Sequence, residues 1–320
     1  MTRHQVYLEG VKNYFYNPFN DAMIELRREF RQLFFDDALE YDKLQDMTKR
    51  RLEQFITALR TALLRHYNRY MQQVLDDLEK FVAVDTHVNA AIMDTTQEED
   101  DSTEAKRKAV AILLGAGQGA LWASVLDTVI PANGVLPADL LQRLTDNSAF
   151  VVESELRKAV ANGLTPKQAL AALLGTPALN LRDGAMTRFG NQADAVTATL
   201  VQHAASIVQA AVASNYFDWY VWVSVIDGKT SEICLSRNGV LYRYGVGPLP
   251  PAHMRCRSKT VPANPGEVVD AGKSYGAWYA AQPSVVRDDM QAPNADKFQN
   301  QPALTPDEFA GKLRFMLARG

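Results

Sequence analysis

The segment Asp227-Gly-Lys-Thr-Ser-Glu-Ile-Cys234-Leu-Ser-Arg-Asn-Gly239 is followed closely by Gly247-Pro-Leu-Pro-Pro-Ala-His253-Met-Arg-Cys256-Arg-Ser258. These two segments contain both cysteines of the chain and one of its five histidines. The sequence before them is typical of helices, and the sequence after them is irregular. Residues 227–262 are thus the part of the chain around which the rest is organised.

The overall composition is that of a globular protein. The chain has 320 residues, a formal net charge of -3, 22% charged residues and 47% apolar residues. A chain of this length buries a large core without help from disulfides or metals, and its length predicts about two domains. The net charge argues against a dedicated nucleic-acid binder, which is strongly basic. The N-terminus lacks the apolar core of a secretory signal, and no apolar run approaches the ~20 residues of a membrane span, so we expect no membrane segment.

The N-terminal third is predicted to be helical, because no proline or glycine occurs from Asp21 to Leu114. Residues 17–20 are a plausible helix start, with Asn20 or Asp21 as the cap, and we expect the first helix to run to about Asp37. A second, from Tyr41 to Phe81, has apolar residues that recur at steps of three and four. Thr165 and Pro166 form a typical helix start. Further helices are predicted over residues 105–130, 138–160, 166–174 and 191–215.

Two local compositions interrupt this helical region. Residues 94–104 contain six acidic residues in eleven and are predicted to be a linker or an exposed loop. Three glycines occur within residues 115–119. No strand is predicted before them, and the spacing Gly-x-Gly-x-x-Gly is not met. We therefore expect a kink or close helix packing there rather than a nucleotide site.

The composition changes at Tyr216. Residues 217–226 are rich in aromatic and β-branched side chains, which predicts a strand. Short strands are expected over residues 233–244 around the hairpin dipeptide Asn238-Gly239, and a last helix over residues 305–319. The predicted fold is therefore predominantly α, with a long N-terminal helical region followed by a small, loop-rich α+β C-terminal domain. Its predicted parts are a helical hairpin or arm (1–93), the acidic linker (94–104), a helical domain (105–215) and the α+β domain with its tail (216–320).

The central segment carries side chains suited to a metal ion. Cys234, His253 and Cys256 supply the sulfur and nitrogen ligands that zinc prefers, and Asp227 is a candidate fourth ligand. Two alternatives remain open. One is a Cys234–Cys256 disulfide, which a reducing cytosol disfavours. The other is a pair of buried thiols beside a hydrogen-bonded histidine.

Known catalytic signatures are missing from the sequence. Neither His-Glu-x-x-His nor Gly-x-Ser-x-Gly occurs, and the zinc-deaminase spacing is also missing. We therefore expect a protein that is not an enzyme. The alternative is a metal- or cysteine-dependent enzyme, such as a delivered effector, with a cysteine nucleophile assisted by His253 and Asp227. His203, on the apolar stretch 191–215, is interpreted as a hydrogen-bonded core residue.

Basic residues gather on the first predicted helix and beside Cys256. Arg27, Arg28 and Arg31 lie among acidic neighbours. This predicts either a solvated face with ion pairs or a contact with DNA phosphates or an acidic protein surface. Arg255 and Arg257 would present two guanidinium groups suited to carboxylates or phosphates. All five arginines are candidate contact residues.

The ordered pattern within residues 216–290 resembles the phage head morphogenesis proteins, also called Mu F-like minor capsid proteins. That family carries Asp-x-Arg-Thr-Ser-x-x-Cys, then a glycine, then Pro-Pro-x-His-x-x-Cys-Arg-Ser. A Trp-rich strand precedes the pattern here, and Lys229 stands where arginine is usual. The matching residues are Asp227, Thr230, Ser231, Cys234, Gly239, Pro250, Pro251, His253, Cys256, Arg257 and Ser258.

The resemblance implies a non-enzymatic virion component, present in few copies inside the phage head and assembled in the host cytoplasm. It implies association with the portal protein and with the major capsid or scaffold protein. The resemblance further implies genomic DNA as a partner, because such proteins act in head morphogenesis and in DNA packaging or delivery. The first 215 residues match the family only in their helical character.

Overall fold

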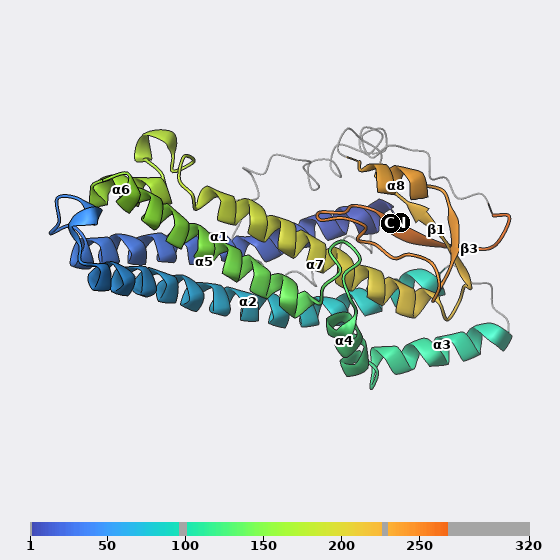
Figure 1. Ribbon diagram of the computed structural model, residues 1–320. Helices are drawn as coiled ribbons and strands as arrows, with labels where there is room; N and C mark the ends of the chain where they lie inside the picture. The colour runs from blue at the N-terminus through green and yellow to red at the C-terminus, as the bar shows by residue number, and fades with distance from the viewer. Residues whose placement is uncertain (1, 96–100, 226–229, 268–320) are drawn as a thin grey trace. The chain divides into compact units, whose positions relative to one another are not determined.

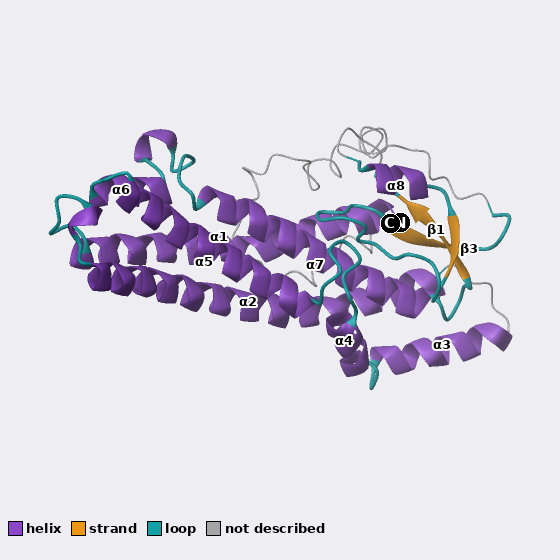
Figure 2. Cartoon of the chain, viewed as in Figure 1, coloured by secondary structure: helices purple, strands orange, loops and turns teal. Residues whose placement is uncertain are grey.

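The computed structural model describes residues 2–95, 101–225 and 230–267 (Figure 1). Helices dominate this part of the chain, and three short strands lie near its C-terminal end (Figure 2), so the predominantly α prediction is confirmed. The predicted last helix over residues 305–319 lies outside the described residues. The elements are α1 (Thr2–Asp37), a 3-10 helix (Leu44–Asp46), α2 (Lys49–Asp94), α3 (Asp101–Leu114), α4 (Gln118–Asp127), α5 (Pro137–Ala161), α6 (Pro166–Leu174), a second 3-10 helix (Pro177–Leu179), α7 (Thr187–Ala213), β1 (Trp219–Val223), α8 (Glu232–Arg237), β2 (Leu241–Arg243) and β3 (Lys259–Ala263).

The chain forms two compact units, each assembled from separate segments. The first, called the sheet unit below, comprises Met1–Tyr14, Asp76–Pro137 and Thr197–Gly320 and contains the strands. The second, the helical unit, comprises Phe15–Leu75 and Ala138–Val196. Each of the helices α1, α2 and α7 is therefore divided, with one segment in the sheet unit and one in the helical unit.

Aromatic side chains join α1 to α2 in the helical unit. Phe19 of α1 contacts Tyr67 and Tyr70 of α2 edge-to-face, with ring centroids 5.8 and 5.1 Å apart. Phe34 and Phe55 make the same kind of contact at 4.9 Å. All five rings are buried. Such pairs stabilise a fold by their buried area and by about 0.5–1.5 kcal/mol beyond it.

Helix α1 begins much earlier than predicted. It starts at Thr2, and Pro18 lies inside it rather than before it. A proline in a helix interior removes a backbone hydrogen bond and costs about 3 kcal/mol. Burial of each large apolar side chain contributes about 1.5–3 kcal/mol, so a continuous apolar stripe outweighs this cost. The predicted start near residues 17–20, with Asn20 or Asp21 as cap, is wrong for this reason. The stripe continues through the proline as Leu8, Val11, Phe15, Phe19, Met23 and Leu26.

Other helix ends follow their local signals more closely. The hydroxyl of Thr165 accepts a hydrogen bond from the backbone N–H of Gln168, and Gln168 Oε1 accepts one from the backbone N–H of Thr165, so the predicted start of α6 is confirmed. The glycines within 115–119 separate α3 from α4, which are bent by 73°, as the predicted kink requires. Helix α2 runs from Lys49 to Asp94 rather than from Tyr41 to Phe81, and α3 begins at Asp101, so the predicted linker 94–104 is partly helical.

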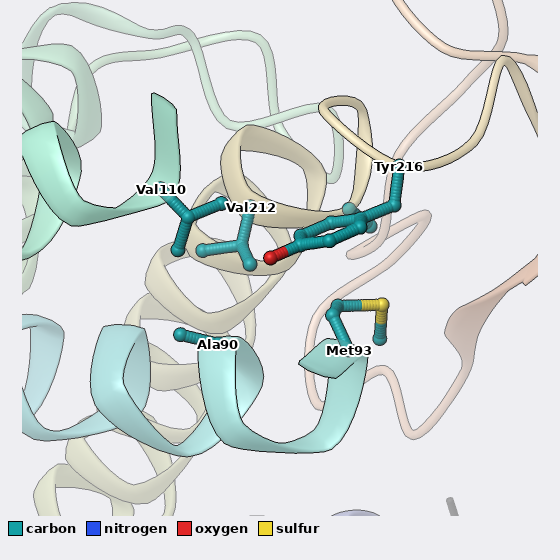
Figure 3. Close-up of a cluster of buried hydrophobic side chains, with 6 residues drawn as sticks. Ala90, Met93, Val110, Val212 and Tyr216 are labelled. Carbon is teal, nitrogen blue, oxygen red and sulfur yellow. The ribbon is translucent and has the colours of Figure 1, made fainter. Parts of the chain in front are cut away.

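A hydrophobic cluster in the sheet unit joins α3 to the C-terminal ends of α2 and α7 (Figure 3). Ala90 and Met93 of α2 gather with Val110 of α3 and Val212 of α7, and Tyr216 lies against them. Strand β1 begins shortly after Tyr216. The cluster therefore fixes the point from which the chain enters the sheet.

The sheet has the strand order β2-β1-β3, and both strand pairs are antiparallel. Trp219 pairs with Arg243 of β2, and Trp222 pairs with Thr260 of β3. Successive residues of a strand point to opposite faces. The consecutive residues 220–222 of β1 are all buried, so both faces of the central strand are covered. The predicted strand over residues 217–226 is confirmed in its central part.

The segment after β1 differs from the predicted short strands over residues 233–244. Residues Glu232–Arg237 form α8, and only Leu241–Arg243 form a strand. Ser231 caps the helix, because its side chain accepts a hydrogen bond from the backbone N–H of Cys234 at 3.4 Å. The dipeptide Asn238-Gly239 ends α8 instead of forming a hairpin turn. Its glycine has a φ of +78°, which glycine adopts without strain.

Helix α7 is the most apolar long helix of the described chain. By length and composition alone, α7 is long and apolar enough to cross a membrane. The same holds for α3 and α4 if this bent pair is counted as one span. Of the most apolar 18-residue stretch of α7, 78% is buried inside the protein. Its apolarity therefore has a packing role.

Phe34 and Phe35 offer a matched test of the helical unit. The Phe34 ring is 0% exposed, whereas Phe35 is 67% exposed. We expect Phe34→Ala to lower the free energy of unfolding by about 3–5 kcal/mol, because it leaves a cavity. Phe35→Ala should change it by less than about 0.5 kcal/mol. Urea unfolding followed by circular dichroism measures both, and a Phe34→Ala variant as stable as the wild type would contradict this burial.

Candidate metal centre

Three of the four predicted ligands come together in the sheet unit. Cys234, His253 and Cys256 each offer one ligand atom, and these atoms lie within 4.8 Å of one another. Cys234 belongs to α8, and the other two belong to residues 250–258, called the ligand loop below. The three side chains lie close enough to hold one metal ion. Asp227, the predicted fourth ligand, lies outside the described residues.

The two cysteine sulfurs are not bonded to each other. Both cysteines are free, and their Sγ atoms are 3.8 Å apart. A disulfide bond would bring them to about 2.05 Å. The structure therefore contains a dithiol facing a histidine and not the Cys234–Cys256 disulfide that was one alternative.

The imidazole of His253 is oriented by its own loop. Its Nδ1 lies 2.8 Å from the carbonyl oxygen of Met254. That contact places a proton on Nδ1 and leaves the lone pair of Nε2 for a metal or a thiol, which is the usual arrangement of metal-binding histidines. The hydrogen bond with Cys256 raises the pKa of His253, and the Met254 carbonyl raises it further.

The two thiols differ in how readily they ionise. The hydrogen bond with Cys234 lowers the pKa of Cys256 well below its usual range, and hydrogen bonds with His253 and with the backbone of Ser258 add to the decrease. The pKa of Cys234 is raised, because the same hydrogen bond retains its proton and because the thiol is buried. Cys256 is thus the thiol of the pair that ionises more readily, and the thiolate is the state that binds a metal.

Buried hydroxyl groups hold α8 beside the sheet. The Ser224 hydroxyl donates to the carbonyl oxygen of Cys234 at 2.8 Å and accepts from Trp222 Nε1 at 2.9 Å. Ser258 Oγ lies 3.0 Å from Ser224 Oγ. Because the single proton of Ser224 is already used, Ser258 is the donor in this contact. Residues from β1, α8 and the ligand loop are therefore tied through one hydroxyl.

The approach to the ligand loop leaves no room for a side chain at Gly247. A Cβ atom there would lie 2.5 Å from Tyr220 Oη and 2.5 Å from Tyr242 Cβ. The Tyr220 hydroxyl also donates to the carbonyl oxygen of Pro248 at 2.6 Å. The chain that leads to His253 is thereby packed directly on the sheet.

The ligand loop is fastened to α1 and α7 within the sheet unit. Lys12 Nζ donates to the carbonyl oxygen of Cys256 at 3.3 Å, to Gln202 Oε1 at 3.1 Å and to Glu9 Oε1 at 2.7 Å. Thr199 Oγ1 accepts from the backbone N–H of Arg255 at 3.0 Å. Lys12 is only 5% exposed, so its ammonium group needs these acceptors to offset the cost of its burial.

Sequence reasoning missed the polar residues that hold this loop in place. Gln209 of α7 donates from Nε2 to the carbonyl oxygen of Thr260 at 2.9 Å. The signal was present as a polar stripe along an otherwise apolar helix. The stripe consists of Thr199, Gln202, Ser206 and Gln209, all buried.

The candidate contact arginines belong to different units. Arg27, Arg28 and Arg31 lie on α1 in the helical unit, whereas Arg255 and Arg257 lie in the ligand loop of the sheet unit. Arg28, Arg31 and Arg255 are exposed, and the other two are half-buried. The structure does not bring the five arginines into one cluster within either unit.

His203 is a core residue, as predicted. It is 1% exposed, and its Nε2 lies 3.1 Å from the carbonyl oxygen of Val125. Burial lowers the pKa of His203, which keeps the imidazole neutral at physiological pH. This histidine therefore stabilises the packing of α7 and takes no part in the metal centre.

No protein-family model matches this chain, and no curated protein or solved structure matches it significantly. The function is therefore inferred from the residues of the chain and their geometry.

Lys259 provides a test of the buried polar groups next to the centre. Burial lowers the pKa of Lys259 to about 7, against the opposing effect of Asp85. Between about pH 7 and about pH 10, the unfolded chain therefore binds one proton more than the folded chain at this site. The free energy of unfolding should rise with pH across this window.

The Lys259→Met variant should lose this part of the rise. Urea midpoints of wild type and variant, measured at several pH values across the window, are the test. Both proteins contain the same thiols, so the difference between the two slopes isolates Lys259. Equal slopes would contradict the lowered pKa.

Proposed function

We propose that Cys234, His253 and Cys256 bind a structural zinc ion. Two Zn–S bonds of about 2.3 Å at the tetrahedral angle place the sulfurs about 3.8 Å apart. The Sγ atoms of Cys234 and Cys256 have this separation, 3.8 Å. Thiolate and imidazole ligands together favour zinc over harder cations. Bound zinc would link α8 to the ligand loop, with Asp227 as the candidate fourth ligand, and such sites contribute on the order of 10 kcal/mol to folding.

We further propose that the chain is a minor head protein of a tailed phage. The observation that supports this is the convergence of the residues that carry the resemblance. Trp222, Cys234 and Cys256 form one buried cluster, which His253 and Ser258 join through the ligand set and the hydroxyl network. Residues far apart in the sequence thus form one structural unit, which supports treating them as a single pattern.

In this role the protein acts in head morphogenesis and in DNA packaging or delivery. It is assembled in the host cytoplasm and then lies inside the virion, in contact with the portal protein and with the major capsid or scaffold protein. Helices α1 and α2, of 36 and 46 residues, offer the extended surfaces that such contacts use. The sheet unit, held by the metal centre, supplies a rigid second surface.

Burial of the centre favours a structural role over catalysis. The side chains of Cys234 and Cys256 are 2% and 0% exposed. At this burial neither sulfur is open to a substrate in the described structure. A metal- or cysteine-dependent enzyme needs an open coordination position or an accessible nucleophile, so this alternative has less support.

Metal analysis tests the zinc proposal directly. Protein purified without added metal should contain about one zinc ion per chain, and the Cys256→Ser variant should contain less than about a tenth of that amount. The Ser236→Ala variant is the matched control, because Ser236 is an exposed residue of α8. Its zinc content should equal that of the wild type.

A count of reactive thiols separates the remaining alternatives. Because burial alone also slows a thiol reagent, the thiols are counted under denaturing conditions with a chelator and the count is compared with the zinc content. Zinc-bound protein should give two thiols and about one zinc ion per chain, and an oxidised pair should give no thiol. A metal-free protein with an oxidised cysteine pair would contradict the zinc proposal, as would a metal-free protein with two thiols.

Assembly in cells tests the head-protein proposal. The chain should be expressed with the portal, scaffold and major capsid proteins of its own phage, and procapsids should be purified and analysed by quantitative mass spectrometry. We expect the chain at a few copies per particle, and we expect its loss from particles that lack the portal protein. Its absence from portal-containing particles would overturn the proposal, whatever its zinc content.

A further inference from the structure

One face of α1 in the helical unit combines exposed apolar and cationic side chains. Residues Ile24, Arg27, Arg28, Arg31 and Phe35, called the α1 stripe below, recur at helical spacing and share one side of the helix. Ile24 and Phe35 are 54% and 67% exposed, although both are large apolar residues. They lie about 16 Å apart along the helix axis, at 1.5 Å per residue.

Three acidic residues of α1 pair with arginines of α2 and not with this stripe. Glu25 accepts from Arg69 at 3.4 Å, Glu29 accepts from Arg65 at 3.0 Å and Asp37 accepts from Arg51 at 2.6 Å. Asp36 accepts from its neighbour Gln32 at 2.9 Å. Glu25, Glu29 and Asp37 are therefore engaged with α2 and not with the stripe arginines.

The three stripe arginines, in contrast, make no ion pair within the described parts of the chain. Arg27 is half-buried, and its Nε has no hydrogen-bond partner there. Burial lowers the pKa of Arg27, and the nearby guanidinium of Arg31 lowers it further. A half-buried cation beside a second cation, without an acceptor, is an unfavourable arrangement that an added anionic group would relieve.

Two possible occupants fit this stripe poorly. A second copy of the chain, docked about a two-fold axis, would bring the arginines of the two stripes together, and like charges oppose that pairing. A DNA backbone would satisfy the arginines, but phosphates offer nothing to the exposed Ile24 and Phe35. The exposed apolar side chains call for an apolar partner surface.

We propose that the α1 stripe docks an acidic amphipathic helix of a partner protein. Apolar residues of that helix would cover Ile24 and Phe35, and its flanking carboxylates would accept hydrogen bonds from Arg28, Arg31 and Arg27. The separation of the two apolar residues matches about three turns of the partner helix. This inference does not depend on the phage assignment, because it rests on the composition and charge of the stripe.

Binding of defined peptides to the full-length protein tests the inference. Two labelled helical peptides are compared. The glutamate peptide has leucines on one face with glutamates beside them, and the lysine peptide has lysine at every glutamate position. Fluorescence anisotropy should show the glutamate peptide binding at least about tenfold more tightly than the lysine peptide. The double variant Arg28→Glu, Arg31→Glu should bind the glutamate peptide about tenfold or more less tightly than the wild type. The Phe35→Ala variant should also bind it less tightly.

The matched control is Arg60→Glu, which reverses an exposed arginine of α2 that lies outside the stripe. This variant should bind the glutamate peptide like the wild type. Equal binding of both peptides, or a double variant that binds like the wild type, would overturn the inference. So would a stripe that instead binds a DNA duplex, or one that mediates self-association in sedimentation experiments.

Discussion

Cys256 is held from two directions, and the geometry of the centre depends on both contacts. Its sulfur lies 3.8 Å from that of Cys234, and its carbonyl oxygen accepts a hydrogen bond from Lys12. The first contact reaches α8, and the second reaches α1. Because the ammonium group of Lys12 is buried, displacing the loop would cost about 1–3 kcal/mol or more in a lost charged hydrogen bond. The protein thus holds the candidate ligand atoms close together through contacts of its own, which would reduce the ordering that a bound metal has to impose.

Much of the fold was predictable because single local rules decide it. The period of the apolar residues fixes the helices, and the reciprocal hydrogen bonds of Thr165 fix the start of α6. Predictions failed where a local signal competed with packing. Pro18 reads as a helix boundary, but buried residues on both sides of it carry α1 through. The division into two units has no compositional signal, because helices such as α1 belong to both and their sequence does not change where the units meet.

The candidate ligands of the centre could be predicted from the sequence, but the residues that hold them in place could not. Cysteine and histidine are rare enough here that their clustering in the sequence marked Cys234, His253 and Cys256, which the structure brings together. Their supporting residues are common types whose role depends on burial. A buried lysine such as Lys12 cannot be told from a surface lysine by its spacing alone. The polar stripe of α7 was visible in the sequence, but only the fold shows that it faces the ligand loop and β3.

Cationic side chains of this protein occur in three environments, and the environment indicates whether a side chain stabilises the fold or is available to a partner. Lys12 is buried and satisfied by fixed acceptors, which makes it part of the framework. Arg65 and Arg69 lie at the surface and pair with carboxylates of α1, contacts that contribute little because water screens them. Arg28 and Arg31 are exposed without a carboxylate in the described chain and have Phe35 beside them. A charge that is neither buried nor paired adds nothing to the stability of the unit that carries it. Together with an exposed aromatic ring on the same face, such charges are best explained by a contact outside this chain.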